Sequence, residues 1–186
     1  MKKGSFIFSL LIVCLLASSC GNRGPVRPER DCPITKLLLN EADFLRDTIV
    51  DTVITPLADY PQESAGIDAT YHADLISQSV ARWYYFSVAI EENEKWMKIA
   101  FNPSRSSTGV YDTPPELSDL NFLPADQIHV ACAEEKNIGY RCRTIARYDE
   151  YQIQLFSDIS ESGVTYEIFR NLVLKINDKM VACLNK

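Results

Sequence analysis

Hydrophobic and polar residues alternate along three neighbouring stretches in the second half of the chain, residues 126–132, 140–148 and 151–159. A period of two residues is typical of a β-strand with one buried face. Turn residues around Asn137 and Gly139 separate the first two stretches. The pattern therefore predicts three strands that form an antiparallel meander.

Two cysteines set the register of the first hairpin of this meander. Aligning Cys132 with Cys142 places Val130 opposite Thr144 and keeps the apolar side chains on one face. A shift of one residue would turn every side chain of one strand to the other face. The alternation therefore predicts this pairing.

Three stretches of the first half also favour strands. Residues 79–88 carry aromatic and aliphatic side chains on both faces and predict a strong strand. Residues 48–55 are rich in β-branched side chains and predict a second strand, and residues 66–73 predict a weaker one.

Helical spacing replaces the strand pattern in two places. Apolar residues recur on one helical face from Ala89 to Phe101, and a second helix begins after Thr165, whose hydroxyl can cap it. The second apolar stripe consists of Phe169, Leu172, Val173, Ile176, Met180, Cys183 and Leu184. We expect an α+β fold, an antiparallel sheet with two main helices packed on one face and braced by disulfides.

The first twenty residues have the order of a secretory signal. Lys2 and Lys3 precede an apolar run, and small residues lead directly to Cys20. The run of about 12 residues is shorter than the ~20 that a bilayer-spanning helix needs. With cysteine at this place, the segment resembles the signal of bacterial lipoproteins, although Ala17 stands where leucine is usual.

The lipoprotein resemblance implies a processing route and a location. Residues 1–19 would be removed as a signal peptide, and Cys20 would receive a diacylglyceryl group and often a palmitate-like acyl chain on its amine. The protein would then be anchored to a membrane of the cell envelope and face the extracytoplasmic side. Gly21 is not the aspartate that retains some lipoproteins on the inner membrane, so we expect the outer membrane in a diderm host. Simple secretion with cleavage near Ser19 is the alternative.

Composition divides the remaining chain into a tether and one domain. Residues 20–31 contain the lipidation cysteine and a Pro-, Gly- and charge-rich segment that cannot build a core. Residues 32–186 have the length of one extracytoplasmic domain. The whole chain has a formal net charge of −6, and the basic signal and tether leave the domain more acidic still. A nucleic-acid partner is therefore not expected.

Four cysteines remain after the signal and the lipidation site, and an even number in an oxidising compartment predicts two disulfides. Three pairings are open, and we prefer Cys132–Cys142 within a hairpin together with Cys32–Cys183. A zinc site is the rival interpretation, but no close C-x-x-C pair exists. We expect no metal and no cofactor.

Two groups of side chains are candidate binding surfaces. Trp83 and Tyr85 share a face with small residues and would form an aromatic platform for a carbohydrate or a protein, unless a helix covers them. Arg141, Arg143 and Arg147 share the face opposite Cys142 and could clamp an anionic group, unless neighbouring acids pair with them.

Catalytic motifs are scarce. The chain has no Gly-x-Ser-x-Gly element and no glycine-rich phosphate loop. His72 and Asp74 could form a base and its orienting group, together with residues of the 102–125 connection. His129 points away from the inward face of its strand and is expected on the surface or hydrogen-bonded.

The end of the chain carries a further resemblance. The Cys132–Cys142 pair, Ala146-Arg147-Tyr148 and Thr165-Tyr166-x-x-Phe169 resemble uncharacterised extracytoplasmic bacterial lipoproteins and, more distantly, the sensor domains of receptor serine/threonine kinases. The resemblance implies a non-catalytic domain that binds a ligand or partner. A structural envelope lipoprotein, and a hydrolase that uses His72 and Asp74, are the alternatives.

Overall fold

A computed structural model describes residues 32–51, 62–83, 86–102, 110–135 and 139–184. The predicted signal peptide, Cys20, the tether and Tyr85 lie outside the described residues. None of the described helices is long and apolar enough to cross a membrane.

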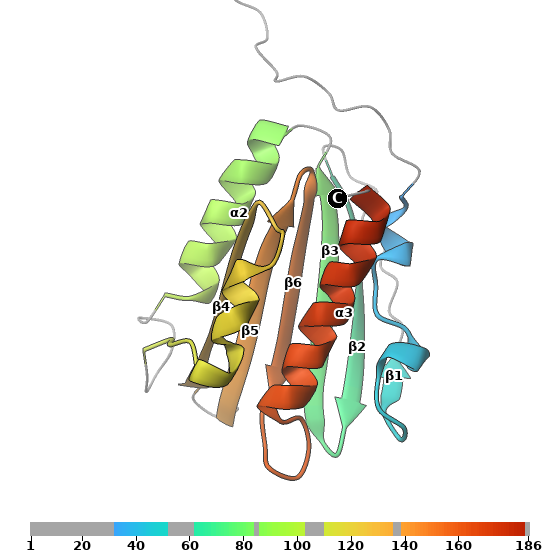
Figure 1. The fold of residues 1–186 in the computed structure, drawn as a ribbon, viewed down its shortest axis with the longest axis vertical. Helices are drawn as coiled ribbons and strands as arrows, with labels where there is room; N and C mark the ends of the chain where they lie inside the picture. Colours follow the sequence, from blue (N-terminus) through green and yellow to red (C-terminus); the bar gives the residue numbers. More distant parts are fainter. Residues whose placement is uncertain (1–31, 52–61, 84–85, 103–109, 136–138, 185–186) are drawn as a thin grey trace, which may run out of the picture.

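An antiparallel sheet forms the centre of the domain (Figure 1). The strands of the described residues are β1 (Ile49–Asp51), β2 (Gln62–Tyr71), β3 (Asp74–Trp83), β4 (Gln127–Glu135), β5 (Gly139–Tyr148) and β6 (Tyr151–Asp158). Their order across the sheet is β1-β2-β3-β6-β5-β4, and every neighbouring pair is antiparallel. The predicted meander is β4, β5 and β6. Its predicted register is confirmed, since Cys132 pairs with Cys142 and Val130 with Thr144.

Two α-helices and three short 3-10 helices complete the described fold. They are α2 (Phe86–Ala100), α3 (Tyr166–Leu184), η1 (Ile34–Lys36), η2 (Glu41–Asp43) and η3 (Pro115–Phe122). Thr165 caps α3 as predicted, because the amide of Ile168 donates to its hydroxyl oxygen at 3.3 Å. The α+β class with an antiparallel, disulfide-braced sheet is thus confirmed.

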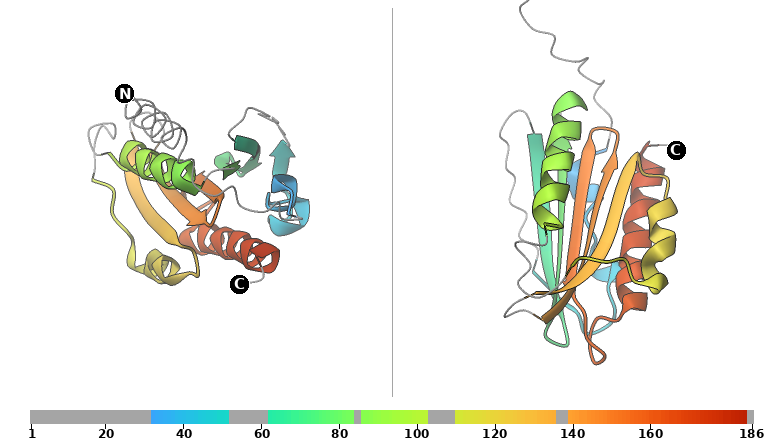
Figure 2. Two further views of the ribbon diagram at one scale, coloured as in Figure 1. Left: turned by 90° about the horizontal axis from the view of Figure 1, so that it is seen from above. Right: turned by 90° about the vertical axis from the view of Figure 1, so that its left-hand side faces the viewer.

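The two α-helices lie on opposite faces of the sheet, and the expectation that both pack on one face is wrong (Figure 2). The hydroxyl of Tyr148 donates a hydrogen bond to the side chain of Asn177 in α3. The side chain of Gln127 points to the other face and accepts a hydrogen bond from Asn93 of α2. We call these two sides the α3 face and the α2 face. The sequence signal for the second covered face was weak, because arginines of β5 stand among its buried apolar side chains, such as Ile145.

The main hydrophobic core lies on the α3 face. Val130, Cys132 and Ile153 of the sheet are buried there with Phe169 and Met180 of α3. Sheet positions two residues apart supply this face, and the apolar stripe of α3 covers them.

The strand predicted over 79–88 is displaced toward the N-terminus. β3 covers 74–83, and its ladder with β6 ends at the pair Arg82–Tyr151. The amide of Trp83 still donates to the carbonyl of Glu150 at 2.8 Å, but β6 begins at Tyr151, so a longer strand would have no ladder on this side, and α2 begins at Phe86. Val88 therefore belongs to a helix, not to the predicted strand.

Both preferred disulfides are present in the structure. Cys132–Cys142 joins directly paired residues of β4 and β5, with a Cα–Cα distance of 4.0 Å. Cys32–Cys183 joins the first described residue to the last turn of α3, with a Cα–Cα distance of 5.9 Å.

Candidate functional site

The segment 32–48, which we call the strap, crosses the α3 face beside α3 (blue in Figure 1). Apolar side chains of the strap enter the core, among them Leu37, Leu39 and Phe44. The strap contains η1 and η2, and a capping box between Asn40 and Asp43 begins η2. It thus extends the cover of the sheet from α3 toward β2.

A buried glutamine fixes the middle of the strap to the sheet. The side chain of Gln78 is 1% exposed and points to the α3 face of β3. Its amide nitrogen donates to the carbonyl of Leu37 at 3.1 Å, and its oxygen accepts from the amide of Leu39 at 2.7 Å. Both polar atoms of the buried side chain are therefore paired, as burial of an amide requires.

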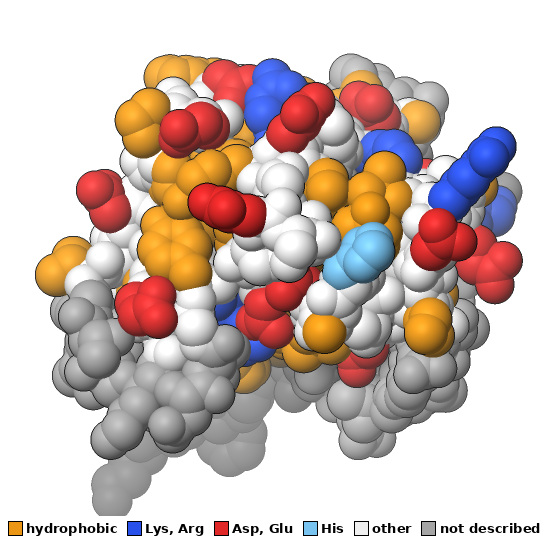
Figure 3. All heavy atoms as spheres, turned by 90° about the horizontal axis from the view of Figure 1, so that it is seen from below, with side chains coloured by type: hydrophobic (Ala, Val, Ile, Leu, Met, Phe, Trp, Pro, Cys, Tyr) orange, Lys and Arg blue, Asp and Glu red, His pale blue; other side chains and the backbone are white. Residues whose placement is uncertain are grey.

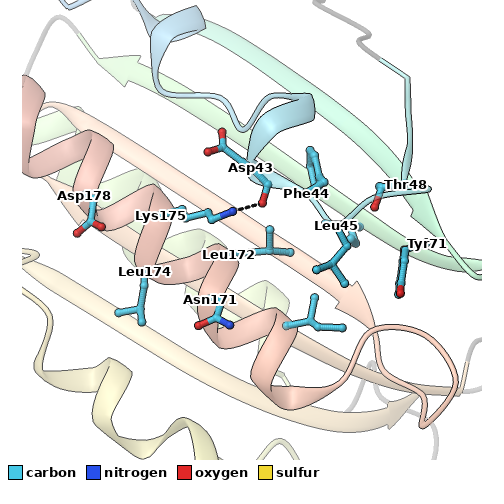
Figure 4. Close-up of a pocket in the computed structure, with 12 residues that line it drawn as sticks. Asp43, Phe44, Leu45, Thr48, Tyr71, Asn171, Leu172, Leu174, Lys175 and Asp178 are labelled. Atoms are coloured by element: carbon cyan, nitrogen blue, oxygen red, sulfur yellow. Dashed lines mark hydrogen bonds between the residues drawn. The ribbon is translucent and has the colours of Figure 1, made fainter.

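Two lysines of α3 hold the other edge of the strap. Lys179 donates to the carbonyl of Leu38 at 2.7 Å and forms an ion pair with the carboxylate of Asp43 at 2.6 Å. One turn earlier, the ammonium of Lys175 donates to the backbone carbonyl of Asp43 (Figure 4). Since Cys32 is also bonded to Cys183, the strap is attached to α3 along its length.

A pocket of about 280 Å³ lies between the end of the strap, α3 and the end of the β2–β3 hairpin (Figure 4). Its apolar lining comes from all three elements: Phe44, Leu45, Tyr71, Ile76, Ile168, Leu172 and Leu174. Its polar lining consists of Asp43, Thr48, Asn171, Lys175 and Asp178. We call it the strap pocket, and its mainly apolar lining with a few polar groups is typical of small-molecule sites.

The polar groups of the strap pocket differ in what they contact. The ammonium of Lys175 donates to the backbone of the strap. The carboxylate of Asp43 forms an ion pair with Lys179. The hydroxyl oxygen of Thr48 is buried without a hydrogen-bond partner within the described part of the chain. Asn171 and Asp178 are exposed at the rim. The base of the pocket is therefore mainly apolar, and its exposed polar groups lie at the rim.

The arginines of the predicted stripe form ion pairs with acidic side chains. Arg141 donates from Nε to Asp158 at 2.8 Å and lies 3.7 Å from a carboxylate oxygen of Glu135. Arg143 forms an ion pair with Glu135 as well, and Arg147 lies 3.8 Å from Asp126. The structure thus brings these arginines together on the α2 face, where each has an acidic partner.

Tyr111 joins the same charged cluster. Its hydroxyl donates to Glu135, and the guanidinium of Arg143 lies 5.7 Å from the centre of its ring. Burial and this hydrogen bond raise the pKa of Tyr111 to about 12. The hydroxyl therefore stays protonated at neutral pH and acts as a donor that holds Glu135 in place.

The predicted aromatic platform is not open at Trp83. This side chain is 7% exposed, and its ring nitrogen is buried without a hydrogen-bond partner among the described residues. It points to the face that α2 covers. Trp83 therefore contributes to the packing of α2 rather than to an accessible surface.

His72 and Asp74 do not form a catalytic pair. The exposed ring of His72 lies in the β2–β3 turn against Tyr71, with ring centroids 4.4 Å apart. The carboxylate of Asp74 accepts from the hydroxyl of Ser160 at 2.6 Å and from the amide of Val164 at 2.7 Å. Asp74 therefore holds the loop before α3. Within the 110–125 part of the predicted connection, η3 packs on β4 and α3 instead.

The second histidine is also part of the packing. His129 lies on the α2 face as expected, with its ring centroid 4.3 Å from that of Phe101. Burial lowers the pKa of His129. Within the described ranges, no group of three or more His, Cys, Asp or Glu side chains could hold a metal ion.

Sequence reasoning missed the strap pocket, although one signal pointed toward it. Gln78 stands between Ile76 and Val80 at inward positions of a strand, and a buried glutamine there requires a partner. The sequence does not identify that partner, because Leu37 and Leu39 lie about forty residues away along the chain.

The comparisons with known proteins give a structural likeness but no sequence match. No protein-family model matches the chain, and no curated protein matches it. The extracellular domain of PknH from Mycobacterium tuberculosis is similar with a TM-score of 0.46 and 11% sequence identity, over 83% of this chain and 100% of that chain. PknH is a mycobacterial receptor kinase, so this neighbour is of the kind that the sequence resemblance named.

Proposed function

We propose that this protein is a lipid-anchored lipoprotein of the cell envelope, whose extracytoplasmic domain binds a small ligand in the strap pocket without catalysing a reaction. The lipid on Cys20 would attach it to the membrane, and residues 21–31 would separate the domain from the surface.

One observation carries the proposal: the disulfide Cys32–Cys183 ties the strap, which forms a wall of the pocket, to α3. Disulfides of this kind persist in oxidising compartments outside the cytoplasm. The four cysteines at positions 32, 132, 142 and 183 are all paired. With Cys14 in the signal, Cys20 is then the cysteine left for modification.

The pocket supports binding rather than catalysis. Its lining combines apolar side chains with exposed polar groups at the rim, and none of the described residues that line it is a histidine, a cysteine or a serine. The usual pairing of a nucleophile with an imidazole base is therefore missing from this lining.

The anchor is tested by metabolic labelling with palmitate and by fractionation of the wild type and of Cys20→Ala. We expect the label and the membrane association to be lost in Cys20→Ala and kept in Cys14→Ala, since Cys14 leaves with the signal. Equal membrane association of all three proteins, or no acyl group on the mature wild type, contradicts the anchor.

Ligand binding is tested with an uncharged fluorescent amphiphile, N-phenyl-1-naphthylamine. The matched variants are Asn171→Trp, which places a bulky ring at an exposed position lining the pocket, and Ala182→Trp, at an exposed position of α3 that does not line it. We expect Asn171→Trp to weaken binding at least fivefold and Ala182→Trp to leave it unchanged. Equal binding by both variants contradicts the strap pocket as the binding site.

A further inference from the structure

We infer that the strap pocket selects an amphipathic amine, with an elongated apolar body and one cationic head. This inference rests on the proposed binding function and adds the chemical class of the ligand. It follows from the shape of the pocket and from the charges at its rim.

The shape favours a slender molecule. The residues of α3 that line the pocket extend from Ile168 to Asp178, which is about 15 Å along a helix at 1.5 Å per residue. Tyr71 and Thr48 lie at one end of this groove, and Asp178 lies at the other (Figure 4). The volume of about 280 Å³ is at the lower limit of the ~300–1,000 Å³ of ligand sites. An alkyl chain or a single aromatic ring on a short chain suits this space.

The apolar body would lie toward the Tyr71 end. Ile76 and Leu172 form a buried base there, and Leu45 of the strap is 44% exposed. Ligand atoms that cover the exposed part of Leu45 replace water by apolar contact, which is favourable by about 25 cal/mol per Å² of buried surface.

The charged side chains beside the pocket differ in what they contact. The formal charges of Asp43, Asp178, Lys175 and Lys179 sum to zero, so the preference for a ligand depends on which group is accessible. The ammonium of Lys175 already donates to the strap, and the carboxylate of Asp43 is paired with Lys179. Asp178 is exposed, and its carboxylate has neither an ion pair nor a hydrogen bond to another described residue. The carboxylate of Asp178 is therefore the charge available to a ligand head, and it attracts a cation and repels an anion.

The surroundings strengthen this preference. The chain carries an excess of acidic residues, and the face of the molecule seen from below shows Asp and Glu side chains between separate hydrophobic patches (Figure 3). The field of these charges adds to that of Asp178 at low ionic strength and is screened by salt.

The experiment compares three probes with the same body: 4-phenylbutylamine, 4-phenylbutanol and 4-phenylbutyrate. Each displaces N-phenyl-1-naphthylamine from the chain that begins at residue 20 and carries Cys20→Ala, so that no lipid or detergent competes for the probes. An exposed ion pair contributes a small free energy, so the amine should bind about fivefold more tightly than the alcohol, and the butyrate more weakly than both.

Two variants that each remove one negative charge separate the effect of the Asp178 carboxylate from the effect of the net charge of the protein. Asp178→Asn should remove the difference between amine and alcohol and leave the affinity for the alcohol unchanged. Asp68→Asn is the matched control, because Asp68 is exposed on β2 with its side chain on the α2 face.

The outcomes distinguish the two proposals. The inference about the ligand class is overturned if 4-phenylbutyrate binds as tightly as the amine, or if Asp178→Asn still prefers the amine. Either result leaves the proposed binding function intact. Displacement by none of the probes, together with equal dye binding in Asn171→Trp and Ala182→Trp, overturns the binding function itself.

Discussion

The two disulfides close loops of very different length, and their removal should therefore cost different amounts of stability. Cys32–Cys183 spans a sequence separation of 151 residues, whereas Cys132–Cys142 spans 10. In the chain-entropy model a cross-link stabilises the fold by restricting the unfolded chain, and the restriction grows with the logarithm of loop length. The model gives about 5 kcal/mol for the long loop and about 3 kcal/mol for the short one.

The perturbations are the double variants Cys32→Ala/Cys183→Ala and Cys132→Ala/Cys142→Ala. Each removes two sulfur atoms, so the difference between the variants isolates the effect of loop length. That difference, about 2 kcal/mol, corresponds to a melting temperature lower by roughly 4–8 °C for a domain of this size.

Urea unfolding of both variants and of the wild type measures the free energies, with an osmolyte added so that each protein starts folded. Dye binding at the strap pocket is a second readout, and it should weaken in Cys32→Ala/Cys183→Ala and persist in Cys132→Ala/Cys142→Ala. Equal losses of stability, or a larger loss from the hairpin pair, would refute the reasoning from loop length.

The remaining predictions concern side chains outside the pocket. Arg141→Met should destabilise the fold by about 3 kcal/mol in urea, because it leaves the partly buried carboxylate of Asp158 without its cation and removes one of the two arginines at Glu135. Arg170→Met, which removes an exposed ion pair of α3, should change little, and equal effects would argue against burial as the cause. Asp74→Asn should lower the free energy of unfolding by about 1–3 kcal/mol and speed amide hydrogen exchange in the loop before α3. Unchanged exchange would contradict the view that Asp74 holds this loop. Burial lowers the pKa of His129, so the unfolded chain takes up this proton first, and stability should fall as the pH drops below about 6.5. His129→Gln should flatten this dependence, and His72→Gln, in the exposed turn, should leave it as in the wild type.

The meander was predictable because its rules are local. Alternation along 126–148 and one pair of cysteines fix both the strands and their register, since a slip by one residue would expose the whole apolar face. The capped start of α3 follows in the same way from Thr165 and the stripe after it.

The side of the sheet that each helix covers was not predictable from these rules. α2 packs mainly on β5, β3 and β6, over a face that combines the arginines of β5 with the buried side chains of Trp83 and Ile145. Because arginines are mostly exposed in folded proteins, a strand that carries several of them is not expected to lie under a helix. The length of the apolar stretch 79–88 also misled the prediction, because the end of β3 is set by its partner β6 rather than by its own residues.

The strap pocket depends on contacts between residues very distant in sequence. Lys175 meets Asp43 over a separation of 132 residues, and Lys179 meets Leu38 over 141. In the sequence, none of these side chains indicates a long-range contact. Lysines in the second half of a helix are usually explained by their favourable interaction with the helix dipole. Their function as clamps emerges only when the strap folds back on α3.

The bridge between Cys32 and Cys183 also decides where mechanical load enters the domain. A pull on the chain ahead of Cys32 passes through the sulfur atoms directly into the last turn of α3. The strap begins at the same residue, so the disulfide shares with the strap a load that the strap would otherwise carry alone. If the proposed anchor attaches the chain to a membrane, movement of that membrane would therefore pull on α3 as well as on the strap, and the disulfide would resist separation of the two walls of the pocket.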